Sequence, residues 1–548
     1  MGERRVLIVD VWARGSGKRL ATVDVLGSGP RTVAGILEKH KVDYVIAPIE
    51  TLLENQWILR EDFSALFISG MSSDIKAAKR AVRIWRKAKG KRPVVSGGPL
   101  ATEASKLLEA GSDLVVVGEA EETLEELALR TGVFDGVVEF EELKTIKGVA
   151  FHDHHKSGKP VYTSRRKPLP SSRLADYWAS VRAIRFYPYY WAARVYVEVV
   201  RGCSNVRVAR EFVREGKSKV YPGCAYCSVL SIWGPARSIP EDRVVSEIKG
   251  LIDKGVRRIV LSGSDFLDYG RDWQLGTEAF LASPKTPLPN LRQVESLLKR
   301  LFSIPEVATG ETVIMIENLK PSTLNEEAAR LLGEYFSGTP VNIGVESGDE
   351  QLLEKMARPF TLEETIKAIE LLIKHGLKPH VYLIYGLPGQ SKESVLKTLK
   401  LIDKLESMGV EKITLYRFTP LPATMLEDHR PGDPSDPLNR LLINRVKEFN
   451  LEAKQRMIGK KLMAIVVARI DGAYIAYPIK HGPVVKIYKE SVHLLEGREL
   501  VGRKAKVLVI GVESDRIVRG RIVTVGRKIS KPSFWELGEA LRRKAWHA

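Results

Sequence analysis

Short runs of β-branched residues alternate with amphipathic helical patterns through the first part of the sequence. The runs RVLIVDVW, YVIAP, ALFISG, PVVSGG and LVVVG are strongly apolar, and segments such as IKAAKRAVRIWRKAK lie between them. Apolar strands separated by amphipathic helices are typical of a parallel sheet that is covered by helices on both faces. We therefore expect an α/β chain that begins with a Rossmann-like, doubly wound sheet over residues 1–130.

The same alternation returns later and predicts a second α/β unit over residues 196–428. Its strands are RVYVEVV, RIVLSGSD, TVIMIEN, PVNIGVES, HVYLIYG and KITLYRF, which indicate a complete or incomplete (β/α) barrel. The connector, residues 131–195, contains FHDHHKSGKPVY, where a Ser-Gly pair between two strand-like runs predicts a hairpin. His152, His154 and His155 in this connector are more typical of solvated residues beside a turn than of a metal site.

A third unit follows the Pro- and Asp-rich breaker RPGDPSDP and has a different period. A linker and a helix are expected over residues 429–456, and five short strands of period two over residues 457–530. Five such strands in a short segment predict a small, OB-like all-β barrel. Residues 531–548, KPSFWELGEALRRKAWHA, predict a basic amphipathic C-terminal helix.

Glycine, serine and an acidic residue follow several predicted strands of the first unit. The carboxyl ends of parallel strands line ligand crevices in doubly wound sheets, although ordinary tight turns also require glycine. The candidate ligand-binding positions at these strand ends are Ser69, Gly70, Ser72, Gly97, Gly98, Gly118 and Glu119.

All three cysteines of the 548-residue chain lie in one stretch, RGCSNVRVAREFVREGKSKVYPGCAYCSVL. An odd and low number of thiols argues against a disulfide framework. A zinc site needs a fourth ligand, and no histidine lies at finger-like spacing. Two interpretations stay open: buried small side chains with a stray thiol, or ligands of an iron–sulfur cluster with one iron left for a substrate. The second makes Cys203, Cys224 and Cys227 metal-binding and catalytic residues.

The cysteines follow the first strand of the predicted barrel, at the carboxyl mouth where barrel active sites lie. Tyr226 offers an aromatic face beside them, and Glu346, at a later strand end, offers a carboxylate for an amine or a ribose hydroxyl. Small residues at other strand ends let backbone amides approach a ligand. These further candidates are Ser262, Gly263, Ser264, Gly386 and Pro388.

Charge and compartment signals are consistent with two kinds of protein. The chain has 86 Lys and Arg against 67 Asp and Glu, a net charge of +19. This excess is expected for a protein that binds a polyanion such as RNA, and equally for the solvated surface of a protein from a thermophile. No apolar run is long enough for a membrane span, and MGERRVLIVD enters a strand pattern without a signal peptide. We expect a cytoplasmic protein without disulfides.

The barrel resembles the radical S-adenosylmethionine (SAM) superfamily. The family motif is C-x3-C-x-aromatic-C; Cys224-Ala225-Tyr226-Cys227 fits its second part, but twenty residues separate Cys203 from Cys224. We expect this insertion to return beside its start, because lengthening a loop costs little entropy. The resemblance implies that the cysteines hold a [4Fe–4S] cluster, and that SAM bound to the open iron yields a 5′-deoxyadenosyl radical. It also implies an electron donor such as a ferredoxin or flavodoxin.

The strand-end motifs of the barrel carry the same resemblance. LSGSDFLDYG is similar to a segment of tRNA methylthiotransferases, and its Ser262, Gly263 and Ser264 match the region that meets the amino group of SAM. GVESG and IYGLPGQS match later strand ends of the superfamily. Gln390 stands where the family frequently has glutamate, which puts one polar contact near adenine in doubt.

The outer units have resemblances of their own. VVSGGPLAT and LVVVGEAEETLEEL are similar to cobalamin-binding domains of radical SAM enzymes, although the D-x-H-x-x-G motif is absent. This resemblance implies cobalamin at the strand-end positions of the first unit; a Rossmann-like domain without a cofactor is the alternative. The small barrel is similar to the RNA-binding TRAM domain, with a purely structural brace as the alternative. The implied RNA-binding residues are Lys460, Lys461, Tyr474, Tyr477, Lys480, Lys486 and Arg519.

The cysteine count distinguishes the activities found in this superfamily. A methylthiotransferase needs three more cysteines for a second cluster, and a radical methylase of the cysteine-pair type needs two more; the chain has none. We therefore expect cobalamin-dependent C-methylation of RNA, either tRNA or rRNA. The alternative is a radical SAM enzyme that acts on a lipid or small metabolite by methylation, coupling or cyclisation, with a structural C-terminal barrel.

Overall fold

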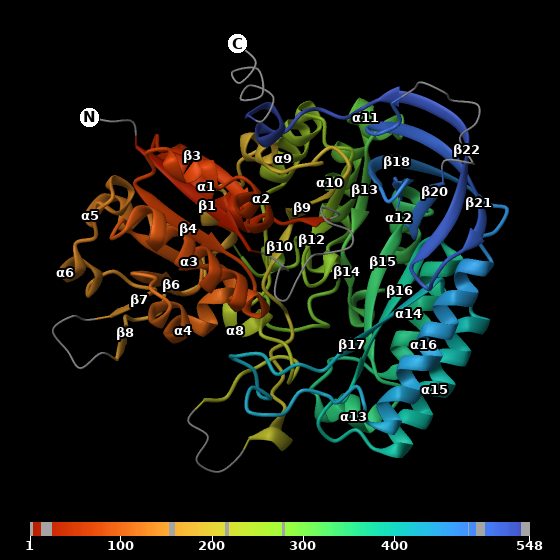
Figure 1. Cartoon of the computed structure of the whole chain (residues 1–548). Helices are drawn as coiled ribbons and strands as arrows, with labels where there is room; N and C mark the ends of the chain where they lie inside the picture. The colour runs from red at the N-terminus through yellow and green to blue at the C-terminus, as the bar shows by residue number, and fades with distance from the viewer. Residues whose placement is uncertain are drawn as a thin grey trace.

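The computed structural model describes residues 4–11, 25–152, 159–213, 219–276, 280–480, 482–488 and 499–538. The three predicted units follow one another along the chain, coloured from red to blue in Figure 1. The predicted fold class is confirmed: a Rossmann-like sheet, a (β/α) barrel and a small closed β-barrel.

The first unit is a seven-stranded sheet in the order β3-β1-β4-β5-β6-β7-β8. Its first five members pair in parallel, and β7 and β8 continue the sheet as an antiparallel hairpin, so the hairpin predicted in the connector belongs to this sheet. The strands are β1 (Arg5–Asp10), β3 (Asp43–Pro48), β4 (Ala65–Ser69), β5 (Val94–Gly97), β6 (Leu114–Val116), β7 (Val149–His152) and β8 (Pro160–Tyr162). The helices are α1 (Gly29–Lys39), α2 (Ile49–Glu54), α3 (Ile75–Lys89), α4 (Ala104–Glu109), α5 (Glu121–Arg130), α6 (Phe140–Leu143) and, beyond the hairpin, α7 (Ser171–Leu174).

The two faces of this sheet belong to different cores. Val6 and Ile8 of β1 pack with α1 and α5, whereas Leu7 and Val9 pack with α2, α3 and α4. This alternation follows from the period of two along a strand. The core on the α1 and α5 side continues into the barrel, so burial of apolar surface joins the first two units.

The second unit is an incomplete barrel made from two four-stranded parallel sheets, β13-β12-β9-β2 and β14-β15-β16-β17. The two sheets meet at Glu317, the single residue between β13 and β14, whose carbonyl accepts a hydrogen bond from the Asn342 N–H. The strands are β2 (Val25–Leu26), β9 (Arg194–Glu198), β12 (Arg258–Ser262), β13 (Val313–Ile316), β14 (Asn318–Leu319), β15 (Pro340–Glu346), β16 (Lys378–Tyr385) and β17 (Lys412–Arg417). The short strand β2, from the first unit's part of the sequence, pairs with the outer edge of β9.

Helices surround this barrel, and a short hairpin lies at its mouth. The helices are α8 (Val229–Trp233), α9 (Glu241–Lys254), α10 (Leu291–Phe302), α11 (Pro305–Ala308), α12 (Glu326–Phe336), α13 (Glu350–Lys355), α14 (Leu362–Lys374), α15 (Lys392–Ser407) and α16 (Pro437–Gln455). The hairpin consists of β10 (Val200–Arg201) and β11 (Arg237–Ser238). The Asp436 carboxylate caps α16 by accepting hydrogen bonds from the Leu438 and Asn439 N–H groups, which explains why this helix begins at Pro437, the last residue of the predicted breaker. None of the helices that the structure describes is long and apolar enough to cross a membrane.

The third unit is a closed barrel in the order β18-β19-β20-β22-β21, with β20 and β22 parallel and the other pairs antiparallel. Numbered along the chain, this is the order 1-2-3-5-4, and the predicted five-stranded barrel is confirmed. Its strands are β18 (Lys461–Ile470), β19 (Ala473–Pro478), β20 (Val484–Tyr488), β21 (Arg503–Val512) and β22 (Ile517–Lys528).

The chain beyond β22 returns to the first unit. Trp535 is buried in the core of the α2, α3 and α4 side, and its indole N–H donates to the Phe186 carbonyl at 2.8 Å. Phe534 packs against Phe186, and Trp57 against Trp535. Residues 534–538 are helical, and the rest of the predicted C-terminal helix lies outside the described residues.

Candidate active site

The first cysteine lies in a tight turn at the carboxyl end of β9. The Cys203 N–H donates to the Gly234 carbonyl at 3.1 Å, next to the β10–β11 hairpin. Gly202 has φ +85°, and a Cβ at this position would lie 2.3 Å from the Pro235 carbonyl oxygen. Only glycine fits there, because both the left-handed backbone and the close approach exclude a side chain.

The long insertion returns beside its start, as the cysteine spacing required. The Gly223 N–H donates to the Arg207 carbonyl at 2.7 Å, which closes the insertion near both ends. Asn205 joins the two cysteine segments: its side-chain amide donates to Cys224 Sγ at 3.3 Å and its backbone N–H to Cys203 Sγ at 3.5 Å.

The other two cysteines lie on one turn that is held from both sides. The Cys227 N–H donates to the Cys224 carbonyl at 2.9 Å. Between them, the buried Ala225 donates to the Met356 carbonyl and accepts from the Leu426 N–H. The turn is therefore fixed by chain segments that follow β15 and β17.

The three thiols fit a cluster better than a single metal ion. All three are free and partly exposed, and burial together with the neighbouring Cys224 and Cys203 raises the pKa of Cys227 to about 12. Within the described part of the chain, no group of three His, Cys, Asp or Glu could hold one metal ion; His154 and His155 lie outside that part. Thiolates of an iron–sulfur cluster bind different irons, so they lie farther apart than ligands of one ion.

An arginine that sequence reasoning missed lies beside the cysteines. The Arg358 guanidinium donates to Cys224 Sγ at 3.3 Å and to the Tyr226 hydroxyl at 3.0 Å. Its other terminal nitrogen donates to the Gly344 carbonyl at 2.6 Å and lies 3.6 Å from Glu346 Oε1. Arg358 thus connects two of the predicted residues, Tyr226 and Glu346, with the cysteine turn.

Glu346 occupies a strained position at the end of β15. It has φ +69°, which is uncommon for a residue with a Cβ, and its carboxylate is buried. Burial raises the pKa of Glu346, while Arg358 and a hydrogen bond from Tyr226 oppose the shift. Backbone strain of this kind is frequent at functional sites.

The end of β12 is tied to the cysteine loop. The Ser264 hydroxyl donates to the Gly202 carbonyl at 2.7 Å. Ser262 and the Gly263 N–H both donate to Glu317 Oε2, at 2.5 and 3.2 Å. Glu317 is a second residue that the sequence did not single out; burial raises its pKa.

The loop after β16 is shaped by Gln390, which replaces the frequent glutamate. The Gly386 N–H donates to Gln390 Oε1 at 2.8 Å, and the Gln390 amide donates to Asn439 Oδ1 at 2.8 Å. A Cβ at Gly386 would lie 2.4 Å from Gly432 Cα. The loop that contains Pro388 is therefore built on close backbone contact with the segment before α16.

A buried charge cluster lies behind Cys203. Lys320 donates to Asp268 Oδ2 at 2.8 Å and to the Ser204 hydroxyl at 2.7 Å, and Arg271 pairs with the same aspartate. The negative charges of Asp268, Cys203 and Asp265 raise the pKa of Lys320 against the effect of burial. A positive charge is thus fixed beside the segment that carries the first cysteine.

The predicted ligand loops of the first unit lie at the carboxyl edge of its sheet. Two of them contact each other: the Ser72 hydroxyl donates to the Pro99 carbonyl at 3.1 Å, and a Cβ at Gly98 would lie 3.2 Å from the Gly70 carbonyl oxygen. Gly118 has φ +91°, and a Cβ at this position would meet no atom of the described residues within 4 Å. Ser69 and Gly97 end β4 and β5, which are paired neighbours.

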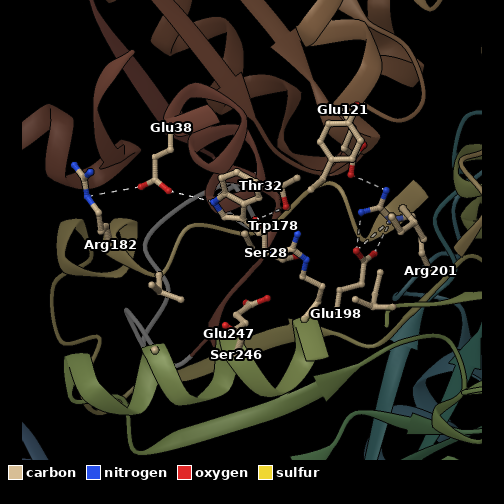
Figure 2. A pocket seen from close by; sticks show the side chains of 17 residues that line it. Ser28, Thr32, Glu38, Glu121, Trp178, Arg182, Glu198, Arg201, Ser246 and Glu247 are labelled. Atoms are coloured by element: carbon tan, nitrogen blue, oxygen red, sulfur yellow. Dashed lines mark hydrogen bonds and ion pairs between the residues drawn. The ribbon is translucent and has the colours of Figure 1, made fainter. Parts of the chain in front are cut away.

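Glu119 and Glu121 form an interdomain ion network with Arg201 and Arg237. Glu119 Oε1 lies 2.7 Å from Arg237 Nη1, and Glu121 Oε1 lies 2.7 Å from Arg201 Nη1. Arg201 also pairs with Glu198 at 2.7 Å (Figure 2). The network joins the loop after β6 to the hairpin that carries Cys203, and borders a cavity of about 450 Å³ between α1, α5 and α9.

The predicted RNA-binding residues do not form one patch. Lys461 and Arg519 are exposed on β18 and β22, and Lys460 precedes β18. Lys480 instead donates to the Ser337 carbonyl of the large barrel at 3.2 Å. Tyr474 lies under Arg469, Lys486 is 3.5 Å from Glu513, and Tyr477 is buried.

Comparison with known proteins supports both α/β units. Residues 222–402 match the radical SAM superfamily model, and residues 21–128 match the B12-binding domain model. An uncharacterized protein of Methanopyrus kandleri is 39% identical, over 96% of this chain and 97% of its own. A second, from Methanocaldococcus jannaschii, is 33% identical over 95% and 98%. A threonylcarbamoyladenosine tRNA methylthiotransferase of Thermotoga maritima is 23% identical over 53% of this chain and 59% of its own.

Solved structures share the fold at low identity. The radical SAM methyltransferase TsrM from Kitasatospora setae superposes with a TM-score of 0.56 and 17% identity, over 77% of this chain and 75% of TsrM. The cobalamin-dependent radical SAM enzyme OxsB gives a TM-score of 0.54 and 14% identity, over 82% and 56%. With the family matches and the convergent cysteines, these likenesses lead to one conclusion: the chain belongs to the radical SAM enzymes that carry a B12-binding domain, whose cofactors are a [4Fe–4S] cluster, SAM and cobalamin.

Proposed function

We propose that this enzyme transfers a methyl group to a carbon atom of RNA. The observation that carries the proposal is the combination of a B12-binding domain with only three cysteines in the whole chain. The methylthiotransferases among the relatives belong to a group whose second cluster would need three further cysteines. Without those thiols, a methyl group held by cobalamin is the transferable group that the chain can supply.

The chain's own residues would bind and orient the reactants. Cys203, Cys224 and Cys227 would hold the cluster, and Arg358 and Glu346 provide a cation and a carboxylate beside the cysteines at the strand ends. When bound, the cluster and SAM would supply hydrogen abstraction from an unactivated carbon, and cobalamin would supply the methyl group. The interdomain network would hold the loop after β6 against the Cys203 hairpin.

RNA is the proposed substrate class because of charge and architecture. The net charge is +19, and the third unit is an OB-like barrel, a class that binds oligonucleotides. A small metabolite is the second candidate, since TsrM, which shares the fold, is described with a tryptophan substrate.

The test uses anaerobically reconstituted enzyme, a reductant, cobalamin and methyl-labelled SAM. We expect label in RNA as a C-methyl group, with two SAM molecules consumed per methyl transferred and one 5′-deoxyadenosine released. Nucleoside mass spectrometry of RNA from a deletion strain identifies the modified base. Formation of 5′-deoxyadenosine with a labelled small molecule, and with unchanged RNA, would favour the metabolite instead.

Two substitutions distinguish residues that bind the cluster from residues that bind SAM. Cys203→Ala should lose iron and SAM cleavage, because no other thiol in the chain can replace it. Glu346→Ala should keep iron but raise the KM for SAM or stop turnover. Glu411→Ala, in an exposed pair with Lys378 on the large barrel, is the matched control and should change neither property.

A further inference from the structure

The outer face of β18, β21 and β22 is a basic surface that contains no acidic residue. Strand pairing places Lys461, Leu508 and Arg521 in one row across the three strands, and Met463, Lys506 and Thr524 in the next. We call this surface the three-strand face; its exposed members are Lys461, Met463, Lys506, Ile510, Arg519, Arg521, Val523 and Thr524. The sequences of the three strands, KLMAIVVARI, RKAKVLVIGV and IVRGRIVTVGRK, contain no Asp or Glu.

The four cations of this face make no ion pair with any residue that the structure describes. Lys461, Lys506, Arg519 and Arg521 have no carboxylate within bridging distance in that part of the chain, and all four are exposed. Basic residues elsewhere on the small barrel differ: Lys486 is paired with Glu513, and Arg527 with Glu311. Unpaired, neighbouring cations leave a positive potential that an anionic polymer can neutralise.

Glycine lets one of these cations lie flat on the sheet. A Cβ at Gly511 of β21 would lie 2.9 Å from Arg519 Nη2, so the guanidinium of Arg519 extends across its partner strand. Arg521 lies two residues further along β22, and Lys461 lies two strands away from it, roughly 10 Å at usual strand spacing. The positive charges are therefore distributed over a surface and not gathered at one point, as a chain of phosphates requires.

Exposed apolar side chains lie among these cations. Met463, Ile510 and Val523 are 51%, 45% and 44% exposed. Apolar side chains between the cations would allow contact with base edges as well as with phosphates.

We propose that the RNA of the proposed function docks on the three-strand face. On β20, the strand that pairs with β22, Lys486 is the register partner of Arg519 and is neutralised by Glu513, which also accepts a hydrogen bond from the Tyr488 hydroxyl at 2.5 Å. Arg469, near the far end of β18, covers the ring of its register partner Tyr474 on β19, and Lys480 donates to the Ser337 carbonyl. The β19–β20 side therefore offers fewer free charges to a polyanion. This inference rests on RNA being the substrate, and it concerns which surface holds it.

The test compares two sets of four substitutions in the full-length holoenzyme. The first is Lys461→Gln, Lys506→Gln, Arg519→Gln and Arg521→Gln together. The matched control is Arg469→Gln, Lys480→Gln, Lys486→Gln and Arg516→Gln, which removes the same charge from cations that already have a partner. Unfractionated tRNA serves as the probe, with binding measured by fluorescence anisotropy over a range of salt concentrations. Iron content and thermal unfolding establish that both variants remain folded.

The face variant should bind tRNA at least tenfold more weakly and show a shallower salt dependence. Each lost phosphate contact reduces the slope of log K against log salt by about 0.9 for duplex and 0.7 for single-stranded nucleic acid. The control should stay within about threefold of the wild type. Equal losses in both variants, or a loss in the control alone, would overturn the docking surface and leave RNA as substrate. Wild-type enzyme that binds neither unfractionated tRNA nor ribosomal RNA at low salt would instead overturn the proposed function.

Anionic vesicles test whether the three-strand face binds a membrane surface instead of RNA. Phosphatidylserine vesicles should not displace tRNA from the wild type at equal phosphate concentration. Displacement that depends on the same four residues would assign the three-strand face to a membrane and overturn its assignment to RNA.

Discussion

The interdomain network and the three-strand face hold basic residues in opposite environments. In the network, Arg201 and Arg237 are buried, and each pairs with a carboxylate of the first unit. On the three-strand face, Lys506 and Arg521 are exposed and unpaired within the described part of the chain. The net charge of +19 therefore does not by itself indicate a binding surface. Buried ion pairs hold chain segments together, whereas exposed cations remain available to an anionic partner.

The physical balance also differs between the two regions. Burial lowers the pKa of Arg237, and Glu119 only partly opposes this effect. A buried cation therefore depends on its partner, and losing that partner is costly. An exposed cation is hydrated by water, so its removal changes the local potential more than the folding free energy.

The largest effect should follow from removing a buried cation. Arg237→Ala leaves Glu119 buried without its main partner, and removes hydrogen bonds to the Leu169 and Pro235 carbonyls. We expect a loss of about 3–5 kcal/mol in the free energy of unfolding, measured by denaturant titration of the apoprotein. Arg521→Ala should change it by less than about 0.5 kcal/mol.

A rescue variant separates charge from packing. Arg237→Met combined with Glu119→Gln removes both charges, and should recover part of the lost stability. An Arg521→Ala variant as unstable as Arg237→Ala would contradict the distinction between the two regions.

A smaller effect is expected from pH, through Asp265. Burial and the neighbouring Asp268 raise the pKa of Asp265 from 3.8 to about 6. The folded state then binds this proton more tightly than the unfolded state. Protonation of Asp265 therefore contributes to the free energy of unfolding below pH 4, and this contribution is lost as the pH rises through 6. The difference in the free energy of unfolding between pH 4.5 and pH 7 is measured by denaturant titration. Asp265→Asn should change this difference by on the order of 1 kcal/mol. An identical pH dependence in the variant and the wild type would argue against the shift.

The smallest effect should come from exposed ion pairs. Lys299 and Glu295 form an i,i+4 pair at 2.8 Å on α10, with both side chains largely in solvent. Because water and salt screen such a pair, Lys299→Ala should leave the midpoint of denaturant unfolding unchanged within the error of the titration. A clear shift of that midpoint to a lower denaturant concentration would show that exposed ion pairs contribute measurably to the free energy of unfolding of this protein.

The sequence predicted the elements whose signals are local. Three cysteines in one stretch predicted the cluster site, and strand periods predicted the three units. The return of the insertion was expected from spacing alone, although only the structure identifies Asn205 as the residue that joins Cys203 to Cys224.

Long-range contacts account for what the sequence did not reveal. Arg358 meets Tyr226 across 132 positions of the chain, and Arg237 meets Glu119 from another unit. β2 has two residues, too few for a periodic signal, and the hairpin of β7 and β8 joined the first sheet because β6 offered a free edge. Lys480 was a reasonable candidate for RNA by composition, but its side chain is directed to the Ser337 carbonyl.

The packing of Trp535 on the first unit sets an order of events during synthesis. Its indole hydrogen bond joins Phe186 to a residue 349 positions later. At bacterial-like translation rates of roughly 5–20 residues per second, about 20–70 seconds pass between the emergence of the two partners. Throughout that time, the surface around Trp57 and Phe186 is without its covering indole. The first unit therefore completes its core only after the other two units have been made, so a ribosome-bound nascent chain should expose this surface to chaperones until translation passes Trp535.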